Sequence, residues 1–318
     1  MKIATDMPLS TYFDGELVGL ERFLDYGERK IEARAKAMTI ADFAKMHPAC
    51  RADVMCEGLE FVRSASEKRR IVCPLYEEAG EESGRRDARL FAFLKEGASD
   101  KPSVIVCAGG GYAFVCNIVE GFPVARRFYD LGYNVFVLNY RVGRAPALPI
   151  ATEDLARAIR LAAELSGQED YILCGFSAGG NLITQWGTDN LGYASHGIAK
   201  PKALLAIYPA LMSEALCFDI RHRGFVKKML GASPDRALRA EYDVFSHAGA
   251  FPPTYFAVGR HDLLIDRKPL LAFSKQLLQH GIPSRADVFQ HAPHGFGEGT
   301  GSGAEGWIEL AHAFMRTL

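Results

Sequence analysis

The chain has 318 residues, of which 48% are hydrophobic and 24% are charged, and its formal net charge at pH 7 is −1. This length is enough for one large hydrophobic core with an appended segment, and the near-neutral charge excludes a global electrostatic attraction to nucleic acid or to an anionic membrane. The sequence has no apolar run typical of a signal peptide or a membrane span, which predicts a cytoplasmic protein.

The cysteines fit the same compartment. There are seven of them, scattered without a C-x-x-C pair, which is typical of reduced thiols rather than of a disulfide framework. Cys107 and Cys174 lie inside apolar runs, where cysteine packs as a small hydrophobic residue. We therefore expect both side chains to be buried.

The N-terminal part of the chain differs in pattern from the rest. Apolar residues spaced among many charges predict two or three amphipathic helices over residues 10–47. We expect an N-terminal helical segment, residues 1–66, followed by a catalytic domain, residues 67–318. The segment is either a cap over the active site or a packing appendage, and the sequence leaves both open.

From residue 69 onward the pattern becomes strand-like and then alternates. Two short apolar runs, 70–76 and 88–94, predict an antiparallel pair at the edge of a sheet. Further strands are predicted over 103–107, 134–138, 171–174, 203–207, 254–258 and 284–289. Helices are predicted over 122–131, 152–165, 181–189, 269–280 and 305–317, and an irregular stretch over 212–253.

Continuous apolar strands that alternate with helices are typical of a parallel sheet buried on both faces. The sequence therefore predicts an α/β fold, with a mostly parallel central sheet of about eight strands and helices on both faces. In such sheets ligands bind at the carboxyl ends of the strands.

The segment Gly175-Phe176-Ser177-Ala178-Gly179 follows one of these strands and opens a helix-like run. It is the one G-x-S-x-G match in the chain, and this pattern is typical of a nucleophile elbow, a sharp turn that exposes a serine hydroxyl. The serine has strained backbone angles there, and a side chain at Gly175 or Gly179 would collide with a neighbouring strand or helix. Ser177 is therefore the candidate nucleophile.

A serine nucleophile needs a histidine as base and a carboxylate that orients the histidine. In this fold the three follow the chain order serine, acid, histidine. Asp262 comes directly after a predicted strand and is the candidate acid, with Asp266 as the alternative. His294 lies just beyond the last strand, between a proline and a glycine, and is the candidate base, with His291 as its competitor.

The glycines of Cys107-Ala108-Gly109-Gly110-Gly111-Tyr112 follow the strand over 103–107. This fold keeps half of its oxyanion hole at that position, so we expect the amides of Gly110, Gly111 and Ala178 to bind the developing oxyanion. A phosphate-binding loop is the alternative. It is disfavoured because Phe114 stands where the last glycine of G-x-G-x-x-G would be, and no lysine-serine pair follows. No H-E-x-x-H or similar metal-ligand spacing occurs.

Aromatic residues flank these groups in the sequence, namely Tyr112, Phe114, Phe176 and Phe296. Aromatic side chains are most often part of the core. Any of these four that face the pocket would narrow its acyl side and favour short acyl groups.

With these residues in place, the chain resembles an α/β-hydrolase of the acetylesterase and acetyl-xylan-esterase-like group, which is related to the hormone-sensitive-lipase-like esterases. The segments that carry the resemblance follow the group's order from about residue 100 to 318: 108–112, 138–142, 175–181, 208–209, 252–254, Asp262 and 294–296. The hormone-sensitive-lipase-like relatives have a histidine before the three glycines, where this chain has Ala108. The first 66 residues match no motif of the group.

The resemblance implies a serine carboxylesterase with Ser177, Asp262 and His294 as its triad and with no metal or organic cofactor. It would remove short acyl groups, such as acetyl from sugars, through an acyl-enzyme intermediate. The implied partner is a small-molecule ester, with no nucleic acid and no membrane, and a homo-oligomer stays open. Two alternatives remain: an amidase, formamidase or peptidase-like serine hydrolase of the same fold, and a non-catalytic binding protein built on it.

Overall fold

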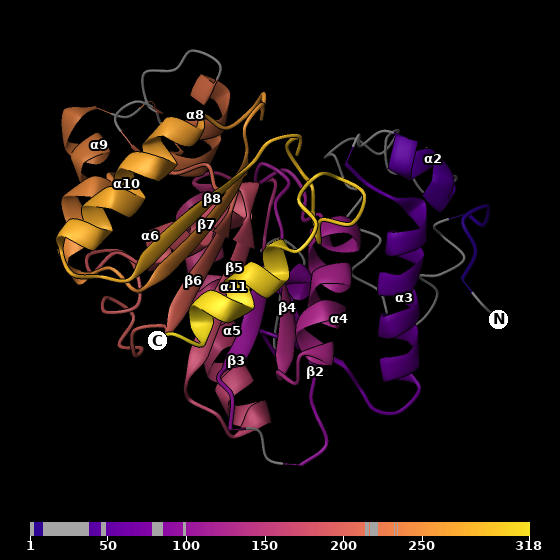
Figure 1. Cartoon of the computed structure of the whole chain (residues 1–318). Coiled ribbons are helices and arrows are strands. Elements are labelled where there is room, and N and C mark those ends of the chain that lie inside the picture. Colours follow the sequence, from indigo (N-terminus) through magenta and orange to yellow (C-terminus); the bar gives the residue numbers. More distant parts are fainter. Residues whose placement is uncertain are drawn as a thin grey trace.

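Eight strands form one sheet in the order β1-β2-β4-β3-β5-β6-β7-β8 (Figure 1). The strands are β1 (Val72–Pro74), β2 (Arg89–Phe93), β3 (Ser103–Cys107), β4 (Val135–Asn139), β5 (Tyr171–Phe176), β6 (Ala203–Ile207), β7 (Thr254–Gly259) and β8 (Ser284–Phe289). The pairs β1–β2 and β2–β4 are antiparallel, and the other neighbouring strands are parallel. The predicted sheet, with its antiparallel pair at one edge, is confirmed.

This computed structural model describes residues 3–8, 38–45, 49–77, 85–97, 100–213, 216, 222–231, 233 and 235–318. Its helices are α2 (Ile40–Lys45), α3 (Ala52–Ser66), α4 (Phe122–Asp130), α5 (Ala147–Ser166), α6 (Ser177–Trp186), α8 (Arg223–Leu230), α9 (Arg236–Tyr242), α10 (Arg267–Gln279) and α11 (Trp307–Met315). Short 3-10 helices span Arg85–Asp87 and Val244–Ala250, and a π-helical turn spans Asn117–Gly121. Among the helices in these ranges, none has the combination of length and hydrophobicity that crossing a bilayer requires.

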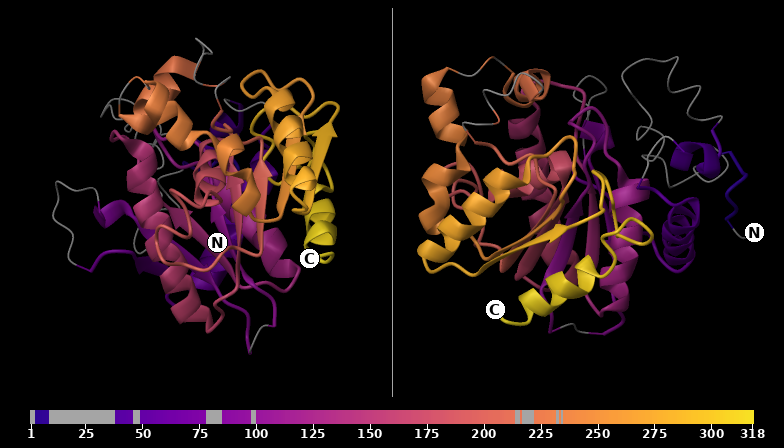
Figure 2. Two further views of the ribbon diagram at one scale, coloured as in Figure 1. Left: turned by 90° about the vertical axis from the view of Figure 1, so that its left-hand side faces the viewer. Right: turned by 45° about the horizontal axis from the view of Figure 1, so that its top comes forward.

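The strand order reverses at β3, because β4 lies on one side of it and β5 on the other. Right-handed connections therefore place α4 on one face of the sheet and α5 and α6 on the opposite face (Figure 2). α11 joins α4 on its face, where the Phe128 and Trp307 rings lie 6.5 Å apart. Ligands bind open α/β sheets at such a reversal, so the carboxyl ends of β3 and β5 are the expected position of the site.

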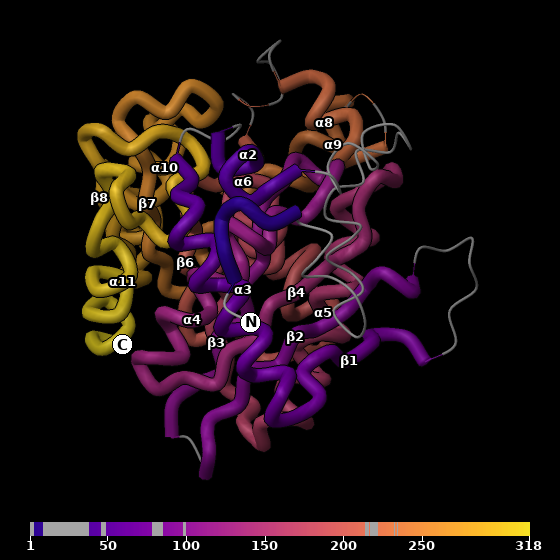
Figure 3. Tube along the Cα trace, turned by 90° about the vertical axis from the view of Figure 1, so that its right-hand side faces the viewer, coloured from indigo at the N-terminus to yellow at the C-terminus, as the bar shows by residue number. Residues whose placement is uncertain are grey.

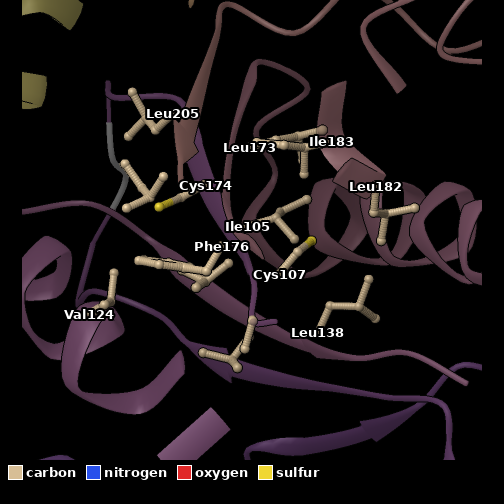
Figure 4. Packing of buried hydrophobic residues seen from close by; sticks show 14 of the residues in the cluster. Ile105, Cys107, Val124, Leu138, Leu173, Cys174, Phe176, Leu182, Ile183 and Leu205 are labelled. Carbon is tan, nitrogen blue, oxygen red and sulfur yellow. The ribbon is translucent and has the colours of Figure 1, made fainter. Parts of the chain in front are cut away.

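Strand β5 shows how the core is divided between the two faces (Figure 4). Phe176 packs against Trp307 of α11, with ring centroids 5.9 Å apart. Gly175, the preceding residue, faces α6, since a Cβ built there would lie 2.9 Å from Ile183 Cγ1. Cys107 and Cys174 are fully buried, as predicted for cysteines in apolar strands.

Helix α3 forms an additional layer outside α4 (Figures 1 and 3). Met55, Leu59 and Val62 recur at helical spacing and are buried. Phe61 stacks on Phe93 of β2, with ring centroids 4.5 Å apart. This part of the N-terminal segment therefore packs on the sheet domain. The helices predicted between residues 10 and 37 lie outside the described residues.

Two predictions of secondary structure are corrected. α5 begins at Ala147, five residues before the predicted start, with Pro149 in its first turn. Proline is tolerated there because its missing N–H would have no partner within the helix. The stretch over 212–253, predicted as irregular, contains α8 and α9. α9 has no buried residue, so the sequence carried no apolar periodicity that could have predicted it.

Candidate active site

The turn between β5 and α6 places Ser177 at the first residue of the helix with φ of +49°. A Cβ on Gly179 would lie 2.0 Å from the carbonyl oxygen of Cys107, and a Cβ on Gly175 would lie 2.4 Å from the carbonyl oxygen of Gly179. The predicted collisions are therefore confirmed. Only glycine allows β3, β5 and α6 to approach closely enough to lift the serine above the carboxyl end of the sheet.

Replacing Gly179 with alanine is expected to lower the free energy of unfolding by more than about 3 kcal/mol, because the added methyl group collides with backbone that cannot rotate away. Urea titration followed by circular dichroism measures this loss. Gly224→Ala is the matched control, since nothing lies within 4 Å of a Cβ built there. If the two variants are equally stable, the close approach at Gly179 does not constrain the fold.

The side chains of Ser177, His294 and Asp262 form a hydrogen-bonded series. Ser177 Oγ lies 3.1 Å from His294 Nε2, and His294 Nδ1 lies 2.8 Å from Asp262 Oδ2. The Asp262 side chain is fully buried and that of His294 is 17% exposed. Asp262 Oδ1 accepts the backbone N–H groups of Leu264 and Ile265 at 2.8 and 2.9 Å, which fixes the orientation of the carboxylate.

The competing residues lie elsewhere. Asp266 is the N-cap of α10, where its carboxylate accepts the N–H of Lys268 at 2.9 Å. His291 is exposed, and no hydrogen bond joins its ring to the series. The structure therefore brings together Ser177, Asp262 and His294 and leaves the alternatives outside.

The glycine loop after β3 passes beside Ser177, since a Cβ built on Gly109 would lie 2.8 Å from Ser177 Cβ. Gly110 and Gly111 have φ of +127° and +61°, in the region that favours glycine. Within the described part of the chain, no group accepts a hydrogen bond from the N–H of Gly110, Gly111 or Ala178. Ala178 lies in the first turn of α6, where the helix dipole also favours negative charge. These three amides are available to an oxyanion.

Three of the four flanking aromatic side chains belong to the core. Tyr112 and Phe176 are fully buried and Phe296 is nearly so. Their place in the substrate pocket stays a prediction. Tyr112 donates its hydroxyl hydrogen to Asn181 Oδ1 at 2.8 Å and so ties the glycine loop to α6. Phe176 ends strand β5, and its ring lies on the face of the sheet that α11 covers, against Trp307. Phe114 is partly exposed and remains a candidate for the pocket.

A small hollow lies between the loop after β6 and the start of α10. Its lining includes Pro209, Ala210 and Leu211 on one side and Leu264 and Ile265 on the other. Ala210 donates its N–H to the carbonyl oxygen of Ser177 at 3.1 Å, and Leu264 follows Asp262 by two residues. The hollow therefore lies next to the turn that carries Ser177 and to the loop that carries Asp262. Most of the residues that line it are apolar.

Two further residues beside the site were not predicted as site residues. Glu120 is 4% exposed, and Tyr208 is fully buried with its ring 4.8 Å from that of His294. Burial raises the pKa of the Glu120 carboxyl, while hydrogen bonds from Gly109 N–H and Tyr208 O–H act in the opposite direction. Glu120 is the one charged residue in the stretch 113–125. An isolated acidic residue in an otherwise uncharged stretch is the sequence feature that could have indicated Glu120 as a site residue.

Comparisons with known proteins show the same fold. The chain matches the family model described as alpha/beta hydrolase fold over residues 104–298. It is 25% identical over 245 residues to endo-1,4-beta-xylanase B of Butyrivibrio fibrisolvens, covering 72% of this chain and 38% of that protein. It is also 25% identical over 227 residues to the acetylxylan esterase of Xylanibacter ruminicola, covering 67% of this chain and 44% of that protein. The chain thus spans less than half the length of these curated relatives.

Among solved structures, an acetyl ester-xyloside bifunctional hydrolase from Caldicellulosiruptor lactoaceticus is similar with a TM-score of 0.64 and 25% identity, covering 77% of this chain and 95% of that one. The propionate-bound esterase Est2 of Thermogutta terrifontis has the same fold, with a TM-score of 0.62 and 19% identity over 77% of this chain and 93% of that one. The family match runs from β3 past His294 and includes the whole hydrogen-bonded series. The chain belongs to the family of proteins with the alpha/beta hydrolase fold.

Proposed function

We propose that this protein is a serine carboxylesterase that hydrolyses short-chain acyl esters of the acetyl type. The observation that carries the proposal is the series Ser177, His294 and Asp262, with hydrogen-bond distances of 3.1 and 2.8 Å, beside the available amides of Gly110, Gly111 and Ala178. Each chemical role of a serine esterase thus has a candidate group in the chain.

In this mechanism Ser177 Oγ attacks the ester carbonyl carbon while His294 Nε2 takes the hydroxyl proton. The buried Asp262 carboxylate stabilises the imidazolium and holds its N–H at Nδ1. The carbonyl oxygen becomes an oxyanion and accepts hydrogen bonds from the loop and elbow amides. His294 then gives its proton to the leaving alcohol oxygen, and water, activated by the same imidazole, hydrolyses the acyl-enzyme and releases the carboxylic acid.

The proposed substrate is an acetyl ester, and an acetylated sugar is the leading candidate. Two similar proteins are named for acetyl esters, an acetylxylan esterase and an acetyl ester-xyloside bifunctional hydrolase, each 25% identical to this chain. We expect a small-molecule ester as the partner, with no nucleic acid or membrane.

Cytoplasmic location is likewise part of the proposal. The cysteines Cys50, Cys56, Cys73, Cys107, Cys116 and Cys174, all in the described part of the chain, are free thiols. Free thiols persist in reducing compartments.

A panel of 4-nitrophenyl esters from acetyl to decanoyl tests the acyl preference. If the proposed acetyl preference holds, kcat/KM will be highest for acetyl and at least about tenfold lower for octanoyl. Acetylated xylose and the matched amide 4-nitroacetanilide complete the panel. Faster turnover of the amide than of the acetate would favour the amidase alternative, and no turnover of any member would favour a binding protein.

A further inference from the structure

Glu120 lies where three segments of the site meet. Its Oε2 accepts the N–H of Gly109 at 2.6 Å, and its Oε1 accepts the hydroxyl hydrogen of Tyr208 at 2.8 Å. The Tyr208 hydroxyl in turn accepts the N–H of Gly297 at 3.1 Å. The Glu120 carboxylate therefore binds the glycine loop after β3 directly. Through the Tyr208 hydroxyl it also binds the loop that carries His294 and Gly297, here called the histidine loop.

These contacts are close to the reacting groups. A Cβ built on Gly109 would lie 2.8 Å from Ser177 Cβ and 2.9 Å from Glu120 Oε2, so the peptide at Gly109 is held between the nucleophile and the carboxylate. The next residue, Gly110, presents one of the available amides. The Tyr208 ring packs against the His294 ring, with centroids 4.8 Å apart. A shift of Glu120 would move both the oxyanion donors and the imidazole.

The local backbone is specialised to place this side chain. Glu120 is in the π-helical turn Asn117–Gly121, and such turns occur often at functional sites. Tyr208 has φ of +37°, which a non-glycine residue adopts only where the surrounding structure enforces it. A buried carboxylate is unfavourable unless donors compensate it, and Glu120 has two. An apolar side chain of similar size would fill the space without linking the two loops.

We propose that Glu120 is a positioning residue of the esterase site, which fixes the oxyanion donors and His294 relative to Ser177. The inference rests on the proposed function, since it assigns Glu120 a part in the same reaction. Glu120 acts through the Gly109 peptide and the Tyr208 hydroxyl and does not touch the substrate.

The test is turnover by Glu120→Gln in the full-length protein with 4-nitrophenyl acetate. The glutamine keeps the shape but has one oxygen for two donors, so either one contact is lost or the Tyr208 hydroxyl must turn and accept from the new amide, and the arrangement of the two loops changes. We expect kcat per active site to fall about tenfold to a hundredfold, with KM within about threefold, because misplaced donors weaken transition-state contacts more than substrate binding. Active sites are counted by titration with a fluorophosphonate, so a mere loss of folded protein leaves this kcat unchanged.

A second measurement uses phenylboronic acid, whose adduct with a serine hydroxyl is tetrahedral and negatively charged. Its inhibition constant should rise in proportion to the loss of kcat/KM, as expected when the lost interactions are made in the transition state.

Tyrosine variants supply a matched pair. Tyr208 and Tyr255 are both fully buried, and each donates its hydroxyl hydrogen to a carboxylate at 2.8 Å, Tyr208 to Glu120 and Tyr255 to Asp287 of β8. Tyr255 is near the amino end of β7, away from the site. Tyr208→Phe should lower kcat about fivefold to tenfold and Tyr255→Phe less than about twofold. The loss of kcat in the double variant Glu120→Gln/Tyr208→Phe should be smaller than the product of the two single losses. The reason is that both residues take part in the same Glu120–Tyr208 hydrogen bond.

Unchanged kcat per active site in Glu120→Gln and Tyr208→Phe would overturn the proposal. If Glu120→Gln does not fold, the two tyrosine variants test the proposal. Equal losses of kcat in Tyr208→Phe and Tyr255→Phe would then overturn the positioning role of Glu120. A wild-type protein that neither hydrolyses the ester nor reacts with the fluorophosphonate would refute the proposed function itself, and the role of Glu120 with it.

Discussion

Replacing Ser177 with alanine is expected to lower kcat for 4-nitrophenyl acetate by at least about 10⁴-fold, as loss of the nucleophile does in other serine hydrolases. In the proposed mechanism this hydroxyl forms the acyl-enzyme, and no other side chain is hydrogen-bonded to His294 Nε2 in the described part of the chain. The amides of the proposed oxyanion hole would remain and would account for the residual rate. Initial-rate measurements on purified protein, with the uncatalysed hydrolysis subtracted, give this ratio.

The Ser177→Ala variant should remain folded. Removing Oγ leaves a partly exposed imidazole, which water can satisfy, so the free energy of unfolding should change by less than about 1.5 kcal/mol. Ser274→Ala is the matched control, because Ser274 is a buried serine of α10 whose hydroxyl bonds Ser284 at 2.8 Å. It should keep full activity. Turnover by Ser177→Ala close to that of the wild type would contradict the assignment of the nucleophile.

Replacing Asp262 with asparagine is expected to lower kcat by about 10³-fold to 10⁴-fold. The backbone N–H groups of Leu264 and Ile265 fix the side-chain oxygen at the Oδ1 position. The new amide nitrogen then faces His294 Nδ1 and donates to it. The ring must carry its proton on Nε2 in that case, and this tautomer cannot accept the proton of Ser177.

The Asp262 experiment has a control in the same loop. Asp266→Ala removes the N-cap of α10 and should lower the free energy of unfolding by about 1 kcal/mol while leaving kcat nearly unchanged. Chemical denaturation and initial rates on the two variants separate the structural carboxylate from the catalytic one. The reverse result, with a large loss of kcat in Asp266→Ala only, would transfer the role of the acid to Asp266.

Much of the fold was predictable from local pattern. Strands such as Ser103–Cys107 and Ala203–Ile207 were predicted with their observed bounds, since a fully buried parallel strand is a continuous apolar run that ends at polar or glycine residues. Helix starts were less well predicted. The predicted start of α5 is too late because Pro149 was placed before the helix, although the first turn tolerates proline. α9 was not predicted because it has no buried face.

The sequence by itself determined the order of strands and helices and the candidates Ser177, Asp262 and His294, because each follows a strand and the carboxyl ends of parallel strands share one edge of the sheet. Only the tertiary structure decided that Asp262 is the carboxylate that reaches His294, that Tyr112 and Phe176 pack in the core, and that Glu120 links the glycine loop to the loop that carries His294. These outcomes depend on contacts between residues far apart in the chain, and on which side of the backbone a side chain lies. Spacing along the sequence does not encode either.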